Sequence, residues 1–239
     1  MSPGFATTQW SVVLSARDGS EDVAREALEA LCEDYWYPLY AYVRGLGHSV
    51  QDANDLTQGF FAELLEKDRL RAIDPSRGRF RSFLLASLKH YISHQWKRGQ
   101  AQRRGGGTQI VPLDVDDAET RYSRDPVYSQ TPELIFERHW GQTVMELALQ
   151  KLRRGRRVEQ LDRLVPYVTG AQPQVSYARM ASELGTSTSA IKSAVHRLRK
   201  RFGRLLREEI AQTVADPDDV DDELRHLLTV VQPWAPAEG

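Results

Sequence analysis

Apolar residues recur every three or four positions along most of the chain, which is the spacing of one face of an α-helix. The first such stretch covers residues 23–46 and is stopped by Gly45 and Gly47. A second is expected to begin near Asp52, because acidic residues suit a first helical turn, and a third covers residues 80–98. The alternating pattern of a strand is weak throughout, so the sequence predicts an all-α fold.

The second half of the chain contains further helical stretches after a break. Residues 105–130 begin with three glycines, are acidic in the middle and show no sustained periodicity, which favours a linker. A threonine, a proline and a glutamate at 131–133 are typical of a helix start, since they offer a capping hydroxyl and a proline at the first helical position. Helices are expected over 132–152 and 158–168.

Two helical stretches, at 176–184 and 190–205, flank a tight turn that contains Gly185. This arrangement is typical of a helix-turn-helix. It predicts two helical domains joined by a linker. The expected divisions are a first domain at 20–104, the linker at 105–130, a second domain at 131–207 and a C-terminal extension at 208–239.

Charge is segregated along the chain although the formal net charge is only −1. Residues 67–104 hold eleven basic and two acidic residues, and residues 192–207 hold seven basic residues and no acid. A single charge run is commonly a solvated face. Two basic runs, one on the helix-turn-helix and one interleaved with Tyr91 and Trp96, favour nucleic-acid binding instead. Aromatic rings stack on bases while Lys and Arg contact phosphates, a combination that suits a single strand.

Composition narrows the class of protein further. With 41% hydrophobic residues, the 239-residue chain can form real cores. Cys32 is the one cysteine, which excludes an intramolecular disulfide and a cysteine-based zinc site. The N-terminal stretch lacks a signal-peptide pattern, and no segment is apolar over a bilayer-spanning length. We therefore expect a cytoplasmic protein with no cofactor, no metal and no membrane partner.

Four stretches resemble one known family. The sequences DANDLTQGFF at 52–61 and DPSRGRFRSFL at 74–84 resemble region 2 of an extracytoplasmic-function sigma factor of bacterial RNA polymerase. The sequences SYARMASELG at 176–185 and AIKSAVHRLR at 190–199 resemble region 4 of the same family. The resemblance implies a protein that binds core RNA polymerase, through its β′ and β subunits, and directs it to promoter DNA. It also implies that the chain is not an enzyme, because the polymerase performs the chemistry.

In this family the acidic helix of region 2 docks on a basic coiled coil of the β′ subunit. The resemblance therefore implies that Asp52, Asp55 and Gln58 contact the polymerase. Asn54 stands where relatives usually carry a glutamate, so one negative charge is missing. The alternative is that these acids only stabilise the helix dipole, and both roles can hold together.

The family binds the −10 promoter element as an opened single strand, through its third helix and the preceding loop. Carried over to this chain, the implied contacts are Arg77, Arg79, Lys89, His90, Trp96, Lys97 and Arg98. Position 90 is often Asn in relatives, so His90 leaves the base contact there open. On periodicity Tyr91 is expected to be buried, whereas the pattern leaves Trp96 open between core and surface.

The second helix of the helix-turn-helix would enter the major groove of the −35 element. The implied contacts are Ser187, Thr188, Lys192, Ser193, His196, Arg197 and Lys200. Ala194 stands where relatives commonly carry Arg. Specificity at that position is therefore expected to differ or to rest on phosphate contacts and DNA shape.

The stretch from Leu56 to Phe61 resembles the branch of the family that is associated with serine/threonine protein kinases. Thr57 lies three residues after Asn54, which places it beside Asn54 on the expected helix surface. A phosphate there would add about −1.5 to −2 charge and replace the missing glutamate. We predict Thr57 as a phosphorylation site and a kinase as a partner, with an ordinary half-buried threonine as the alternative. An anti-sigma factor is a further candidate partner.

Other interpretations of the same residues stay open. An ordinary helix-turn-helix repressor would bind duplex DNA and no polymerase, and a metal-dependent phosphodiesterase would use Asp52, Asp55 and Glu63. Residues 208–223 hold eight acids and no base, and residues 208–228 are expected to form an acidic amphipathic helix. This tail is either an inert solubilising segment or one that folds back on a DNA-binding region and competes with DNA.

Overall fold

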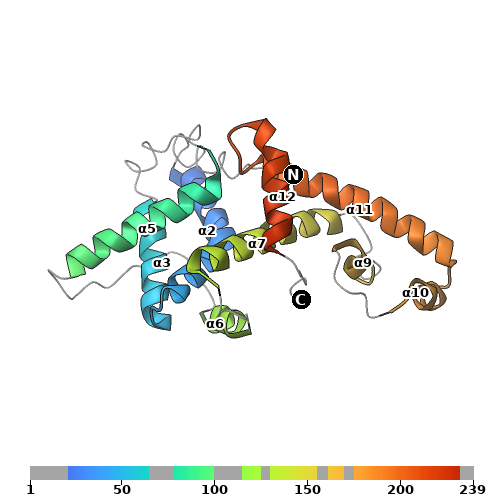
Figure 1. The fold of residues 1–239 in the computed structure, drawn as a ribbon, viewed down its shortest axis with the longest axis horizontal. Coiled ribbons are helices and arrows are strands. Elements are labelled where there is room, and N and C mark those ends of the chain that lie inside the picture. Colours follow the sequence, from blue (N-terminus) through green and yellow to red (C-terminus); the bar gives the residue numbers. More distant parts are fainter. Residues whose placement is uncertain are drawn as a thin grey trace.

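The computed structural model describes residues 21–64, 78–99, 115–124, 130–154, 161–169 and 175–231. Every regular element in these ranges is a helix, which confirms the predicted all-α class (Figure 1). None of the described helices is both long and apolar enough to cross a lipid bilayer. In chain order they are α2 (Glu21–Gly45), α3 (Val50–Leu64), α5 (Phe80–Gly99), α6 (Val115–Arg124), α7 (Pro132–Arg153), α9 (Val165–Thr169), α10 (Tyr177–Glu183), α11 (Thr188–Ala211), the 3₁₀-helix η3 (Pro217–Asp219) and α12 (Val220–Val230).

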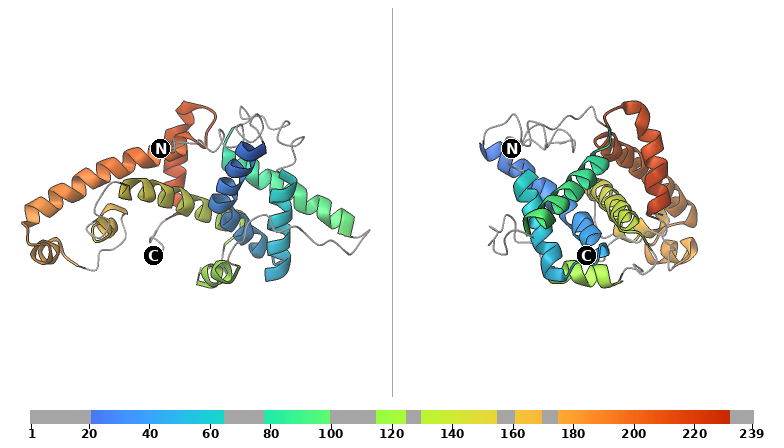
Figure 2. Two further views of the ribbon diagram at one scale, coloured as in Figure 1. Left: turned by 180° about the vertical axis from the view of Figure 1, so that it is seen from behind. Right: turned by 60° about the vertical axis from the view of Figure 1, so that its left-hand side comes forward.

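Helix α7 is the central element of an elongated molecule. It packs along α2 on one side and along α11 on the other, and α12 crosses it near the middle (Figures 1 and 2). Helices α3 and α5 lie towards one end of the molecule, and α10 with the start of α11 forms the other end. The two predicted blocks therefore touch through α2 and α7, and their division into two domains stays a prediction.

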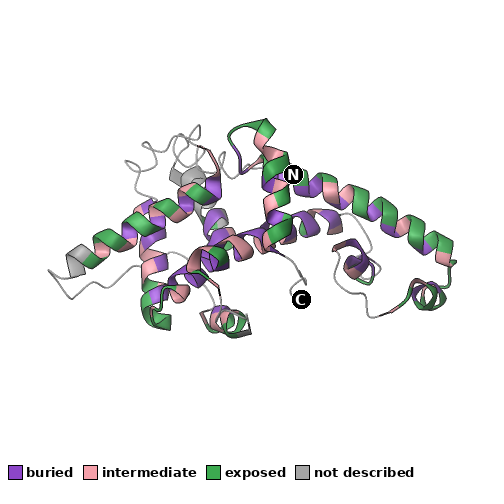
Figure 3. Cartoon of the chain, viewed as in Figure 1, coloured by how far each residue is buried: buried purple, intermediate pink, exposed green. Residues whose placement is uncertain are grey.

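Large side chains of α2 and α7 form the centre of one continuous apolar core. Trp140, Tyr35 and Phe136 are completely buried there, and the buried positions follow the inner face of each helix (Figure 3). Thr131 caps α7 by accepting a hydrogen bond from the backbone N–H of Leu134, and Pro132 occupies the first helical position. The helix start predicted at 131–133 is thus confirmed.

Helix α6 lies within the segment that the sequence assigns to a linker, so the expectation of no sustained helical pattern there is wrong for residues 115–124. The carboxylate of Glu119 accepts hydrogen bonds from Arg44 (2.8 Å) and from the hydroxyl of Tyr40 (2.7 Å). The bond to Arg44 lowers the pKa of Glu119. Because these partners lie more than seventy positions away in the chain, the local pattern gives no indication of them.

Two predicted helices have different bounds in the structure. Of the helix expected over 158–168, residues 161 and 162 are helical, a turn follows at 163–164, and α9 covers Val165–Thr169, while residues 155–160 lie outside the described part. Pro166 lies in the first turn of α9, a position that a proline fits. The tail is also not one helix: α11 continues to Ala211, and Asp216 then caps η3 before α12 begins.

Candidate nucleic-acid and polymerase interfaces

Helix α3 presents an acidic surface at its start. Ser49 precedes the helix; its hydroxyl accepts a hydrogen bond from the backbone N–H of Asp52 (3.1 Å) and donates one to the Asp52 carboxylate (2.7 Å). Asp52 and Asp55 are exposed, and the half-buried Gln58 donates from its amide to Asn54 (3.1 Å). Asp52 therefore takes part in ordering the helix start, while both carboxylates remain accessible to a basic partner.

The prediction that Thr57 lies on the helix surface is wrong. Its side chain is 0% exposed, and its hydroxyl donates to the backbone carbonyl of Ala53 at 2.7 Å. It belongs to the buried stripe of α3, which comprises Ala53, Thr57, Phe60, Phe61 and Leu64. A kinase needs an accessible hydroxyl, so phosphorylation of Thr57 stays a prediction that requires α3 to open first.

Helix α5 exposes several of the residues expected to contact a single DNA strand. The indole of Trp96 is 73% exposed. His90 is also exposed, and the centre of its ring lies 4.4 Å from that of His94. Tyr91 is buried against Phe60 with ring centroids 6.0 Å apart, as expected from periodicity. Outside the described part lie Arg77 and the side chains of Lys97 and Arg98.

Lys89 contributes to the contact between α5 and the start of α7. Its ammonium group donates to the Glu133 carboxylate at 2.7 Å and lies 5.8 Å from the centre of the Tyr42 ring. The hydrogen bond raises the pKa of Lys89 and lowers the pKa of Glu133. Both side chains are nearly half exposed, so the pair contributes little to stability and can be exchanged for a phosphate.

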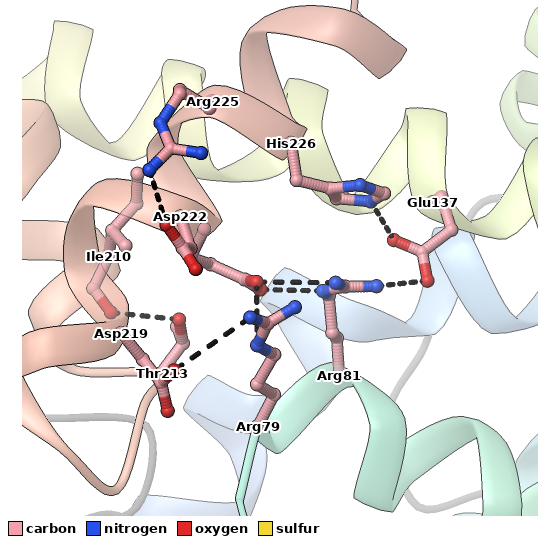
Figure 4. A network of polar contacts seen from close by, with 10 residues as sticks. Arg79, Arg81, Glu137, Ile210, Thr213, Asp219, Asp222, Arg225 and His226 are labelled. Carbon is pink, nitrogen blue, oxygen red and sulfur yellow. Dashed lines mark hydrogen bonds and ion pairs between the residues drawn. The ribbon is translucent and has the colours of Figure 1, made fainter.

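The basic residues at the start of α5 are already paired in the structure. The guanidinium of Arg79 lies 3.2 Å from a carboxylate oxygen of Glu223 and 3.9 Å from one of Asp219 (Figure 4). Arg81, which is only 6% exposed, donates to both oxygens of Glu223 at 2.5 and 3.2 Å. Of the residues predicted to contact the −10 strand, Arg79 is thus held by the C-terminal extension.

A second carboxylate completes this cluster. Glu137 of α7 accepts from Arg81 and faces the imidazole of His226 at 2.8 Å (Figure 4). Burial on its own would lower the pKa of Arg81, but the hydrogen bonds and charges of Glu223 and Glu137 raise it. The guanidinium also lies 5.2 Å from the centre of the Trp140 ring, a distance typical of a cation–π contact.

Arg81, Glu137 and Glu223 form a group that the sequence does not predict. Arg81 and Glu223 are 142 positions apart, so no local pattern connects them. One local feature nevertheless indicates that Glu223 has a partner. It lies four residues before Leu227 and therefore on the buried face of α12. A carboxylate on the buried face of a helix requires a cationic partner.

The helix-turn-helix forms as the sequence predicts. Ser176 and Ser187 cap α10 and α11 by accepting hydrogen bonds from backbone N–H groups, and Gly185 makes the turn with a φ of 61° that favours glycine. Five of the predicted −35 contacts are exposed on one side of α11, namely Lys192, Ser193, His196, Arg197 and Lys200. Ile191 and Val195 face the core.

The basic residues of α11 fall into two groups. Towards its C-terminal end, Arg204 pairs with Glu208 and Arg207 pairs with Asp221, and at mid-helix Arg199 donates to the backbone carbonyl of Tyr167. No ion pair among the described residues engages Arg197 or Lys200. The charge that remains available to a phosphate therefore includes positions from the turn to the middle of the helix.

Among the described residues, no group of three or more histidine, cysteine, aspartate or glutamate side chains is arranged to hold a metal ion.

No protein-family model, curated protein or solved structure matches this chain. The arrangement of the residues themselves is therefore the basis of the proposal that follows.

Proposed function

We propose that the chain is a sigma factor, which binds core RNA polymerase in the bacterial cytoplasm and directs it to promoters through two separate DNA contacts. Helix α5 binds the opened −10 strand, and the N-terminal half of α11 enters the major groove of the −35 element. The acidic start of α3 binds a basic surface of the polymerase. In this proposal the chain itself catalyses no reaction.

The single observation that best supports the proposal is the exposure of Trp96. The indole is 73% exposed on the basic helix α5. Helix α5 lies at the opposite end of the molecule from the helix-turn-helix (Figure 1). An exposed indole is costly in a protein that only needs to be stable, whereas it offers a stacking surface to an unpaired base. Two such distant surfaces suit a promoter with two separated elements.

Replacing Trp96 by alanine should weaken binding to single-stranded DNA by roughly 5- to 100-fold, because stacking on one aromatic residue contributes about 1–3 kcal/mol. Fluorescence anisotropy with a labelled oligonucleotide measures this. Trp96→Phe is the matched variant, since it keeps a ring and should keep most of the affinity. Equal affinity of all three proteins would show that the indole does not contact the strand.

A helix-turn-helix repressor remains the second candidate function, and it is favoured only by the well-formed α10–α11 pair. A repressor needs neither the exposed indole of Trp96 nor the acidic start of α3. Gel filtration of the full chain with core RNA polymerase separates the two functions. The sigma-factor proposal expects a stable complex, and elution of the folded chain apart from the polymerase would contradict it.

A further inference from the structure

Helix α12 contacts three other elements at the centre of the molecule. It crosses α7 and lies beside the C-terminal part of α11 (Figures 1 and 2). Its Glu223 side chain reaches the start of α5 (Figure 4). The segment that leads into it is also tied to α5, because the backbone N–H of Phe80 donates to the carbonyl of Thr213 at 2.8 Å. The acidic extension thus folds back on both predicted DNA-binding blocks.

Glu223 makes the polar part of this contact. Its side chain is completely buried, and its two oxygens contact Arg79, which directly precedes α5, and Arg81 in the first turn of α5. A carboxylate that binds a guanidinium has the geometry that a phosphate would use in its place. Glu223 therefore occupies Arg79, which is the one member of this cluster that is predicted to contact the −10 strand.

The apolar part of the contact between α12 and α7 is closely packed but involves few residues. Leu227 and Val231 are buried against α7, where Gly141 allows a close approach. A Cβ atom added at Gly141 would lie 2.5 Å from a methyl carbon of Val231 and 3.4 Å from one of Val230. The helix is short, with eleven residues, and its other face is exposed at Asp221, Asp222, Arg225, Leu228 and Thr229. Such an element can detach while the core between α2 and α7 stays folded.

The charge pattern argues against a purely structural role. A buried carboxylate with two guanidinium partners is costly to desolvate, and apolar residues of similar size commonly stabilise such a contact at least as well. The extension also pairs with exposed residues of α11, where Asp221 contacts Arg207, but these pairs lie away from the predicted −35 contacts such as Arg197. Its buried carboxylate, Glu223, contacts Arg79 at the start of α5 instead.

We propose that α12 is an autoinhibitory helix: in the free chain Glu223 withholds Arg79 from single-stranded nucleic acid, and the strand binds α5 fully only after α12 detaches. This inference rests on the proposed function in one respect, namely that α5 binds a DNA strand. It requires no contact with RNA polymerase.

Two full-length variants detach α12 by independent means. Glu223→Gln removes the buried charge and keeps the shape, and Gly141→Ala inserts a methyl group between α7 and α12 without changing any charge. Each has a matched control. Asp222→Asn removes one charge from an exposed position of the same helix, and Gly203→Ala adds a methyl group on α11 where no atom lies within 4 Å.

Two measurements are made on each protein: amide hydrogen exchange of residues 220–231, and anisotropy of a labelled single-stranded oligonucleotide at low salt. We expect both detaching variants to exchange at least about tenfold faster in α12 and to bind the oligonucleotide about three- to tenfold more tightly, since affinity rises with the open fraction. Both controls should match the wild type in both measurements.

Faster exchange without tighter DNA binding in Gly141→Ala would overturn the proposal, because α12 would then be only a structural element. Unchanged exchange in both detaching variants would also overturn it. Circular dichroism identifies a variant that fails to fold. In that case the result of the other detaching variant alone tests the proposal. Binding of the chain to core polymerase distinguishes the two proposals. If the detaching variants bind the strand more tightly but the chain does not bind polymerase, autoinhibition is supported and the sigma-factor function is contradicted.

Discussion

Replacing Asp52 and Asp55 together by lysine should weaken binding to core RNA polymerase by at least about a hundredfold, because juxtaposing like charges at an interface costs several kcal/mol. Both carboxylates are exposed at the start of α3, so their reversal leaves the buried face of the helix unchanged. Titration of a labelled chain with core polymerase, followed by anisotropy, measures the effect. The loss should shrink at high salt, since exposed charges are screened.

A second double reversal provides the control for this experiment. Asp116 and Asp117 are also exposed acids in the first turn of a helix, so replacing both by lysine makes the same change of charge on α6. The α6 reversal should leave the affinity within about threefold of the wild type. A similar loss in both variants would indicate a general effect of net charge, and no loss in the α3 reversal would remove α3 from the interface.

Replacing Trp140 by alanine should lower the free energy of unfolding by about 3–5 kcal/mol, the range measured for large-to-small changes at buried aromatic positions. The indole is 0% exposed in α7, the helix that contacts α2, α11 and α12. Its loss would leave a cavity at the junction of these helices. Guanidinium chloride unfolding measures the change through the midpoint, provided that the slope is unaltered.

Trp96→Ala is the matched control for this substitution, because it removes the same side chain from an exposed position on α5. Its effect on unfolding should stay within about 0.5 kcal/mol. The two tryptophan variants therefore separate the two roles that the structure gives to these side chains. Equal destabilisation by both would contradict the burial of Trp140 and the exposure of Trp96.

The elements that the sequence predicts well are those with local causes. Ser176 and Ser187 cap the two helices of the helix-turn-helix, Gly185 makes the turn between them, and each of these choices is visible within a few residues. The burial of Tyr91 also follows from helical spacing alone. A helix can be placed from the amino-acid sequence alone when its capping residues, its terminating residues and its apolar spacing all indicate the same range.

The features that the sequence does not show depend on contacts between distant parts of the chain. Helix α6 is held by Arg44 and Tyr40 of α2, and α12 is held by Arg81 of α5 and by Arg79 just before that helix. The burial of Thr57 is a different case. Its neighbours Phe60 and Phe61 indicate an apolar face, but a threonine is compatible with either side of a helix when its hydroxyl bonds to the preceding turn.

The most direct test of the sigma-factor proposal is promoter-dependent transcription in vitro with core RNA polymerase, using a library of random upstream sequences and sequencing the transcripts. The account predicts that the wild-type chain enriches transcripts from one class of promoter with two separated elements. It also predicts that Arg197→Ala reduces transcription that depends on the −35 element by roughly tenfold while leaving the affinity for core polymerase unchanged. No enrichment over core polymerase alone, with a folded chain, would contradict the account.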